Sequence, residues 1–144
     1  MWNSSVNHAY KQKTHNKYPS KIGYSRHFLR FGQFGIKATS SGRLTEEQLN
    51  SLDRSLIKKL KEVSNGNKNF KLWSLLSTNL SLTKLSSESR MGKGKGSVYT
   101  HALFVKPGFI LFEFSGLSRH QVLDIIDFIK NKISLKIILV LQDS

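Results

Sequence analysis

A helix between residues 45 and 63 is the most tightly specified element of this sequence. Thr45 stands where a helix N-cap is expected, and Gln48, three residues later, completes a capping box. Apolar residues then recur at intervals of three and four positions and predict one continuous apolar face: Leu49, Leu52, Leu56, Leu60 and Val63. A second helix is predicted to begin near Ser118, which has Gln121 in the same capping-box position.

Runs of apolar and β-branched residues predict strands between and around these helices. The predicted strands are 33–39, 70–76, 98–106, 109–115 and 135–141. Pro107-Gly108 is a turn signal, so the third and fourth of these strands are predicted to pair as an antiparallel hairpin. Residues 77–89 have too many Ser and Thr for an assignment. The combination predicts an α+β fold, with a mostly antiparallel sheet and two amphipathic helices packed on one side.

A chain of 144 residues suits one domain. We expect an extended basic N-terminal arm over residues 1–32, followed by a single α+β domain over 33–144 with a basic glycine-rich loop at 86–97. The formal net charge is +14, and residues 1–45 hold eight Lys and Arg and no acid. Such an excess predicts a polyanionic partner, either nucleic acid or an acidic membrane surface.

Several classes of protein are disfavoured by composition. No cysteine is present, which rules out disulfides and thiolate zinc sites. No apolar run approaches the length of a membrane span. A membrane-surface protein would need an amphipathic helix with a strongly cationic face, but the segment 118–133 carries Asp124 and Asp127 beside a full apolar stripe, which is typical of a core helix.

The stretch "RMGKGKG", residues 90–96, contains three cations and three glycines. It fits neither the phosphate-binding loop, which needs four residues between its first glycine and Gly-Lys, nor the G-x-G-x-x-G dinucleotide fingerprint. Alternating glycines instead permit positive φ and close backbone approach, while each lysine supplies a point charge. A solvated loop is the alternative, but the basic background favours contact with nucleic acid.

No metal, cofactor or catalytic set is predicted. The five histidines are scattered, with no short-spaced pair. Glu113 alone lies within a predicted strand, beside His101 across the predicted hairpin, where a structural ion pair is the commoner arrangement. An enzyme acting on RNA, with His101 or Glu113 as acid–base group, is therefore the alternative to a protein that binds RNA without catalysis.

Aromatic residues interleave with the basic arm: Tyr10, Tyr18, Tyr24, Phe28, Phe31 and Phe34. Aromatic rings can stack on unpaired bases, and the tyrosines are the better candidates for this contact. The spacing of three between Phe28, Phe31 and Phe34 fits packing onto the core equally well.

The stretch 90–116, "RMGKGKGSVYTHALFVKPGFILFEFSG", resembles the signature of the universal large-subunit ribosomal protein sixteen family, of the bacterial and organellar type. Residues 31–49, "FGQFGIKATSSGRLTEEQL", are similar to a second block of that family. The two blocks stand in the family's order and approximate separation, and the resemblance covers about residues 28–140. It implies the same α+β fold and a structural, non-enzymatic role in the large ribosomal subunit.

The resemblance also implies binding to large-subunit ribosomal RNA beside the aminoacyl-tRNA site, with the loop reaching toward the peptidyl-transferase centre. The implied partners are large-subunit rRNA, aminoacyl-site tRNA and neighbouring ribosomal proteins, with no membrane. The expected RNA-binding residues are Lys21, Arg26, Lys37, Arg43, Arg90, Gly92, Lys93, Gly94, Lys95 and Gly96. The cations would contact RNA, and the glycines would allow close approach.

Residues 72–89, "LWSLLSTNLSLTKLSSES", are more polar and serine-rich than the comparable segment of that family. Many Lys, Asn, Ser and Ile residues suit an A/T-rich organellar gene. We therefore expect a mitochondrial ribosome, with another organellar or a bacterial cytoplasmic ribosome as the alternative.

Overall fold

The computed structural model describes residues 21–64, 69–92 and 94–142. Its helices are α1 (Glu46–Val63) and α2 (Arg119–Lys130). Its strands are β1 (Phe34–Ala38), β2 (Gly42–Thr45), β3 (Lys71–Ser74), β4 (Leu80–Lys84), β5 (Ser97–Val105), β6 (Ile110–Ser115) and β7 (Ile137–Leu141). No helix in the described residues is both long and apolar enough to cross a membrane.

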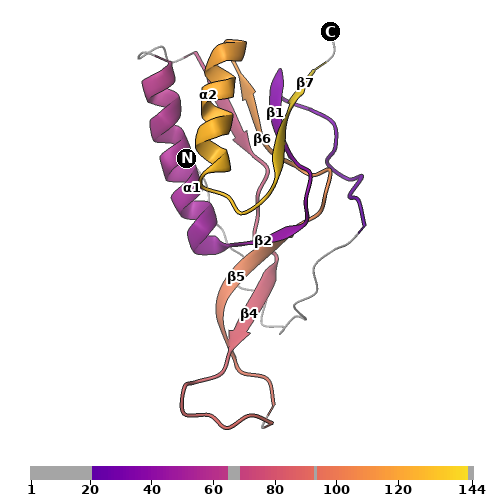
Figure 1. Ribbon diagram of the computed structural model, residues 1–144, viewed down its shortest axis with the longest axis vertical. Coiled ribbons are helices and arrows are strands. Elements are labelled where there is room, and N and C mark those ends of the chain that lie inside the picture. Colours follow the sequence, from indigo (N-terminus) through magenta and orange to yellow (C-terminus); the bar gives the residue numbers. More distant parts are fainter. Residues whose placement is uncertain (1–20, 65–68, 93, 143–144) are drawn as a thin grey trace.

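The strands are divided between two sheets. One has the order β3-β6-β1-β7 and the other the order β2-β5-β4, and every neighbouring pair is antiparallel. Both helices lie side by side against the larger sheet, and the smaller sheet extends away from them (Figure 1). The predicted α+β class with antiparallel pairing is confirmed, although the sequence did not indicate that the strands would form two sheets.

Both predicted capping boxes are present. The Thr45 N–H donates to Gln48 Oε1 over 3.0 Å, and the Gln48 N–H donates to Thr45 Oγ1 over 3.4 Å. Ser118 and Gln121 make the same reciprocal pair at the start of α2. Gln121 Nε2 also donates to the Val63 carbonyl over 3.0 Å, so one side chain caps the start of α2 and satisfies a terminal carbonyl of α1.

The core lies between the two helices and the larger sheet. Phe112 and Phe114 of β6 and Ile36 of β1 are fully buried there. The helices contribute the faces that their spacing predicted: Leu49, Leu52, Leu56 and Leu60 from α1, and Val122, Ile125, Ile126 and Ile129 from α2. This layer accounts for most of the buried apolar surface and therefore for most of the stabilisation from the hydrophobic effect.

The predicted hairpin of residues 98–106 with 109–115 is wrong. β5 pairs with β2 and β4, and β6 pairs with β1 and β3, so both hydrogen-bonding edges of each strand are already occupied. The turn at Pro107-Gly108 instead pairs with the end of β1: the Gly108 N–H donates to the Ala38 carbonyl over 2.7 Å, and the Ala38 N–H donates to the Phe109 carbonyl over 2.8 Å. The turn bends the chain from one sheet into the other.

Residues 34–45 and 102–114 thus form one long antiparallel ribbon that bends where the two sheets meet. Lys37 opposite Ile110 and Gly42 opposite Val105 follow one register across the bend, whereas a register shift between Ile36 and Lys37 moves the rest of the β1–β6 pairing by one residue. Gly108 has φ 87°, a left-handed conformation that favours glycine at this position. The bent ribbon joins the β1–β6 pair of the larger sheet to the β2–β5 pair of the smaller sheet.

Residues 30–32 lie on the face of the larger sheet that points away from the helices. Glu113 of β6 is opposite Gly35 and Trp73, and pleating places it on the other face from Phe112 and Phe114. Its Oε2 accepts the N–H groups of Arg30, Phe31 and Gly32 over 3.1, 2.7 and 2.9 Å, respectively. The carboxylate is completely buried, and the three donors replace the water lost by Oε2, whereas Oε1 has no hydrogen-bond partner within the described residues.

Replacing Glu113 should destabilise the protein strongly. Glu113→Ala leaves three N–H groups without their acceptor, and we expect the free energy of unfolding to fall by about 3–5 kcal/mol, as when one partner of a buried charged pair is removed. Glu113→Gln keeps an acceptor of similar shape without the charge and should cost less, about 1–2 kcal/mol. Urea unfolding at neutral pH measures both. Glu88→Ala, at an exposed position, is the control; an equally small effect of Glu113→Ala would contradict the anchoring role.

Asp53 on α1 should make stability depend on pH. Burial raises the pKa of the Asp53 carboxyl, and the nearby Ser74 hydroxyl offsets part of the rise, although neither Ser74 Oγ nor Asp53 Oδ1 completes a hydrogen bond within the described residues. The native state therefore holds the Asp53 proton more tightly than the unfolded state does. This tighter proton binding stabilises the native state at low pH, and the stabilisation is lost as the pH rises through the raised native pKa.

Asp53→Asn should accordingly raise the urea midpoint at neutral pH. The gain should shrink as the pH falls toward 3.8, the ordinary value for this carboxyl, because both proteins are then uncharged at this position. Asp127→Asn, at an exposed position on α2, is the matched control. A gain that is the same at acidic and neutral pH would contradict the assignment to desolvation.

Candidate nucleic-acid interface

The glycine–lysine loop, residues 85–96 in the structure, connects β4 to β5. The two strands form an antiparallel hairpin, with Leu80 opposite Ala102 and Lys84 opposite Ser97. β2 pairs only with residues 102–105 of β5. Residues 97–101 of β5 therefore extend past the end of β2, with β4 as their neighbour. At about 3.3 Å per residue this extension is roughly 16 Å long. It places the loop at the far end of the molecule from the helices (Figure 1).

The base of the loop is held together by close backbone contact at Gly96. A Cβ at this position would lie 2.8 Å from the Leu85 nitrogen and closer still to the Lys84 carbonyl oxygen, so no larger residue fits without a backbone shift. Just beyond, the register slips between Leu82 and Thr83, which leaves Tyr99 as the extra residue of a β-bulge. Gly96 therefore allows close approach within the hairpin itself.

The tip of the loop depends on glycine for a different reason. Gly92 and Gly94 have φ values of 92° and 94°, which residues with a Cβ rarely adopt, yet a Cβ at either position would meet open space. The side chain of Met91, which precedes Gly92, is 94% exposed. Lys93, one of the predicted RNA contacts, lies outside the described residues. The tip is thus an exposed backbone with special torsions rather than a packed turn.

The loop is basic and largely open to solvent. Arg90 and Lys95 are exposed, and Glu88 is the one acidic residue of the 85–96 segment. Within the described part of the chain, Arg90 forms no salt bridge. The Ser89 N–H donates to the Ser86 carbonyl over 3.1 Å, and the two hydroxyls are 2.6 Å apart, which orders the side of the loop nearer β4. Arg90 can therefore contact a phosphate without first losing an ion pair to a described residue.

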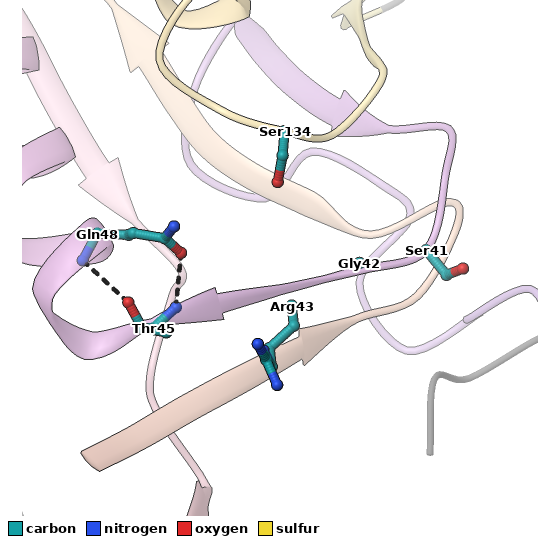
Figure 2. A pocket seen from close by; sticks show the side chains of 6 residues that line it. All are labelled: Ser41, Gly42, Arg43, Thr45, Gln48 and Ser134. Carbon is teal, nitrogen blue, oxygen red and sulfur yellow. Dashed lines mark hydrogen bonds between the residues drawn. The ribbon is translucent and has the colours of Figure 1, made fainter. Parts of the chain in front are cut away.

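Lys37 and Arg43 lie on neighbouring strands but in different sheets. Lys37 is half-buried on β1, opposite Ile110 and Ile138. Arg43 is half-buried on β2, beside the start of α1. It borders an open polar hollow of about 610 Å³ (Figure 2), whose lining residues are Ser41, Gly42, Arg43, Thr45, Gln48 and Ser134. The arginine and the helix N-terminus favour an anion in this hollow, whereas Glu46 and Glu47 in the first turn oppose one.

Lys21 and Arg26 belong to the segment before β1. Lys21 is exposed. Arg26 also has exposed surface, but its guanidinium donates to the Leu75 carbonyl and lies 5.4 Å from the centre of the Phe109 ring. It therefore helps to attach this segment to the body of the protein. The loop, the two strand cations and the arm cations lie on separate elements of the fold.

The arrangement of Glu113 and His101 excludes them as a catalytic pair. Glu113 is fully buried and accepts backbone N–H groups, while His101 lies in the other sheet, opposite Ser81. The ion pair expected for Glu113 is also wrong, because its partners are main-chain donors more than eighty positions earlier. In the described residues no group of three or more His, Asp and Glu residues is placed to hold a metal ion.

Two further residues of the hairpin could contact a polyanion and were not identified from the sequence. Lys84 is exposed at the end of β4, next to the loop, and Tyr99 is 56% exposed at the bulge. Residues 77–89 had no predicted structure, so Lys84 could not be placed on a strand. No local sequence signal distinguishes a bulged position such as Tyr99 from its neighbours.

Comparison with known proteins gives three consistent results. The family model described as ribosomal protein L16p/L10e matches residues 6–140. The chain is 48% identical over 127 residues to the large ribosomal subunit protein uL16m of Chondrus crispus. The aligned region covers 88% of this chain and 92% of the relative. It is 37% identical over 90 residues to the large ribosomal subunit protein uL16 of Leptospira biflexa serovar Patoc, covering 62% of this chain and 61% of that protein.

The two kinds of glycine in the loop should respond differently to substitution. Gly96→Ala introduces a clash with the Lys84 backbone, and we expect it to lower the free energy of unfolding by about 1–3 kcal/mol, as overpacking does. Gly92→Ala meets open space but keeps a positive φ, so its cost should be the backbone strain alone, about 1–2 kcal/mol, and less where the tip rearranges. Urea unfolding of the two variants measures this difference, and a greater loss from Gly92→Ala than from Gly96→Ala would contradict the geometry.

Proposed function

The chain belongs to the ribosomal protein L16p/L10e family, and from this premise we propose that it binds large-subunit ribosomal RNA beside the aminoacyl-tRNA site. It is a structural constituent of the large ribosomal subunit, of the mitochondrial type, and not an enzyme. The glycine–lysine loop would reach toward the peptidyl-transferase centre. The partners would be large-subunit rRNA, aminoacyl-site tRNA and neighbouring ribosomal proteins.

The observation that carries this proposal is the position of the loop. Its described cations are exposed at the end of a two-stranded extension, as far from the helices as the fold allows (Figure 1). An isolated two-stranded hairpin is only marginally stable in water. A partner that surrounds the extension would give it additional contacts, and a phosphate-lined crevice in folded RNA suits its charge.

The mechanism is electrostatic. Double-helical segments of RNA repel one another through their phosphates, and Lys or Arg side chains placed between them neutralise part of that charge. Because Gly92 and Gly94 carry no Cβ, they allow the positive φ of the tip and keep the loop narrow where it would enter. Arg90, Lys93 and Lys95 would then contact phosphates from a backbone that lies close to the RNA.

The remaining predicted contacts would bind RNA over a wider surface. Lys37 and Arg43 lie on the bent ribbon, while Lys21 lies on the arm. Arg26 already contacts Leu75 and Phe109, so its role in RNA binding would be shared with attachment of the arm. The division into an arm over 1–32 and a domain over 33–144 stays a prediction.

Removing the loop lysines should weaken binding to large-subunit rRNA and flatten its dependence on salt. Each phosphate contact contributes about −0.9 to the slope of log affinity against log salt concentration. We therefore expect Lys93→Ala with Lys95→Ala to reduce the magnitude of the slope by about 2. Filter binding or anisotropy with an rRNA transcript, over a series of salt concentrations, measures both quantities.

The matched control is Lys58→Ala with Lys61→Ala. These exposed lysines lie on α1, and the substitution removes the same net charge far from the loop. If charge alone matters, both double variants should behave alike. If the loop substitutions change neither the rRNA affinity nor the slope of log affinity against log salt concentration, a contact role for the loop is refuted.

A further inference from the structure

Five aromatic side chains lie in two contacting groups in the region where residues 21–32 cross the larger sheet, and we call Tyr24, His27, Phe28, Phe31 and Trp73 the aromatic strip. We propose that the strip stacks on unpaired nucleotides of RNA, at a second contact region distinct from the glycine–lysine loop. This inference rests on the proposed function, since it names a further way in which the same RNA is held.

The strip is unusually exposed for aromatic residues. Tyr24, Phe28 and Phe31 have 74%, 72% and 56% of their surface accessible. The earlier alternative of core packing holds for Phe34, which packs against the core, but not for Phe28 or Phe31. Tyr10 and Tyr18 lie outside the described residues. Large aromatic side chains that are exposed on one short segment suit a surface that contacts a partner.

The backbone beneath the strip is fixed at several points. The Gly23 N–H donates to the Pro107 carbonyl over 2.9 Å, and the Ile110 N–H donates to the Arg26 carbonyl over 2.9 Å. Glu113 accepts three successive N–H groups at residues 30–32. Gly32 lies directly against the Phe114 backbone, where a Cβ would be 2.8 Å from the Phe114 nitrogen. The rings are therefore presented without the entropic cost of ordering a flexible segment on binding.

The rings themselves are arranged in two contacting groups. Tyr24 meets His27 edge-on at 6.0 Å between centroids, and His27 lies 3.9 Å from Phe28 at 45°. Phe31 and Trp73 are stacked, with centroids 5.9 Å apart and planes 23° apart. In both groups a phenylalanine with a large exposed surface is supported by a second ring. A nucleobase could extend either group by stacking on the exposed phenylalanine.

The charge around the strip favours RNA over an apolar protein surface. Residues 21–45 contain five Lys and Arg and no acid. Arg30, between Phe28 and Phe31, forms no salt bridge within the described ranges. The carboxylate that lies closest along the sheet, Glu113, is buried and occupied by backbone donors. Aromatic platforms flanked by cations are typical of surfaces that bind single-stranded nucleic acid without reading its sequence.

The test compares single-stranded with double-stranded RNA, using the full chain. An RNA oligomer without self-complementarity exposes base faces, whereas a blunt duplex of the same length hides them. We expect Phe28→Leu with Phe31→Leu to weaken binding to the single strand by about tenfold or more. Affinity for the duplex should change by less than about twofold. Because no charge is removed, the salt slope should stay at the parent value.

Trp73 offers a second measurement. The chain has two tryptophans, so Trp2→Phe leaves Trp73 as the only one. Its emission should be quenched by the single strand and not by the duplex, and Phe31→Leu should reduce the quenching. Ile57→Ala, which shortens an exposed apolar side chain on α1, is the control and should alter neither binding nor emission.

Three results would overturn the inference. The double leucine variant could bind the single strand as tightly as the parent, or it could lose affinity equally for both RNAs. Alternatively, Phe28→Ala with Phe31→Ala could lose affinity while the leucine variant does not, which would indicate apolar contact with a partner rather than stacking. Failure of the proposed function is distinct: the parent protein would then fail to bind the large-subunit rRNA transcript at all.

Discussion

The bent ribbon made by residues 34–45 and 102–114 holds every other part of the structure in position. It belongs to both sheets, so its inner residues complete the core under the helices while its far end carries the β4–β5 hairpin. The bend keeps its register through hydrogen bonds between Ala38 and the turn at Gly108 and Phe109. Because the ribbon is continuous, the exposed loop is attached to the most deeply buried strand of the protein.

The charge of the chain is distributed to suit this architecture. The excess of cations lies on the arm, the strand surfaces and the loop, while the core of the described residues contains one ionisable side chain that is fully buried, Glu113. The Oε2 atom of that carboxylate accepts backbone donors rather than Lys or Arg, while its buried Oε1 has no hydrogen-bond partner within the described residues. No surface cation is therefore consumed by attaching the arm through Glu113, and the positive charge stays available for a polyanion.

Local signals in the sequence were sufficient for both helices, for the strands β1, β3, β5, β6 and β7, and for the presence of a loop before β5. Both capping boxes and both apolar faces were predicted because they depend on residues three and four positions apart. The short strands β2 and β4 were missed, since four or five half-polar residues show no clear period. The predicted pairing of 98–106 with 109–115 was wrong because a turn signal indicates that the chain changes direction, but not which strand becomes the hydrogen-bonded neighbour. The role of Glu113, and the contact between Gly96 and Lys84, depend on partners that only the fold brings close.

A density map of the large ribosomal subunit that contains this chain would test the central claim most directly. The account predicts nucleotides around residues 85–96, with phosphate groups within hydrogen-bonding distance of Arg90, Lys93 or Lys95. A map that shows the loop in open solvent, or covered only by neighbouring proteins, would contradict it.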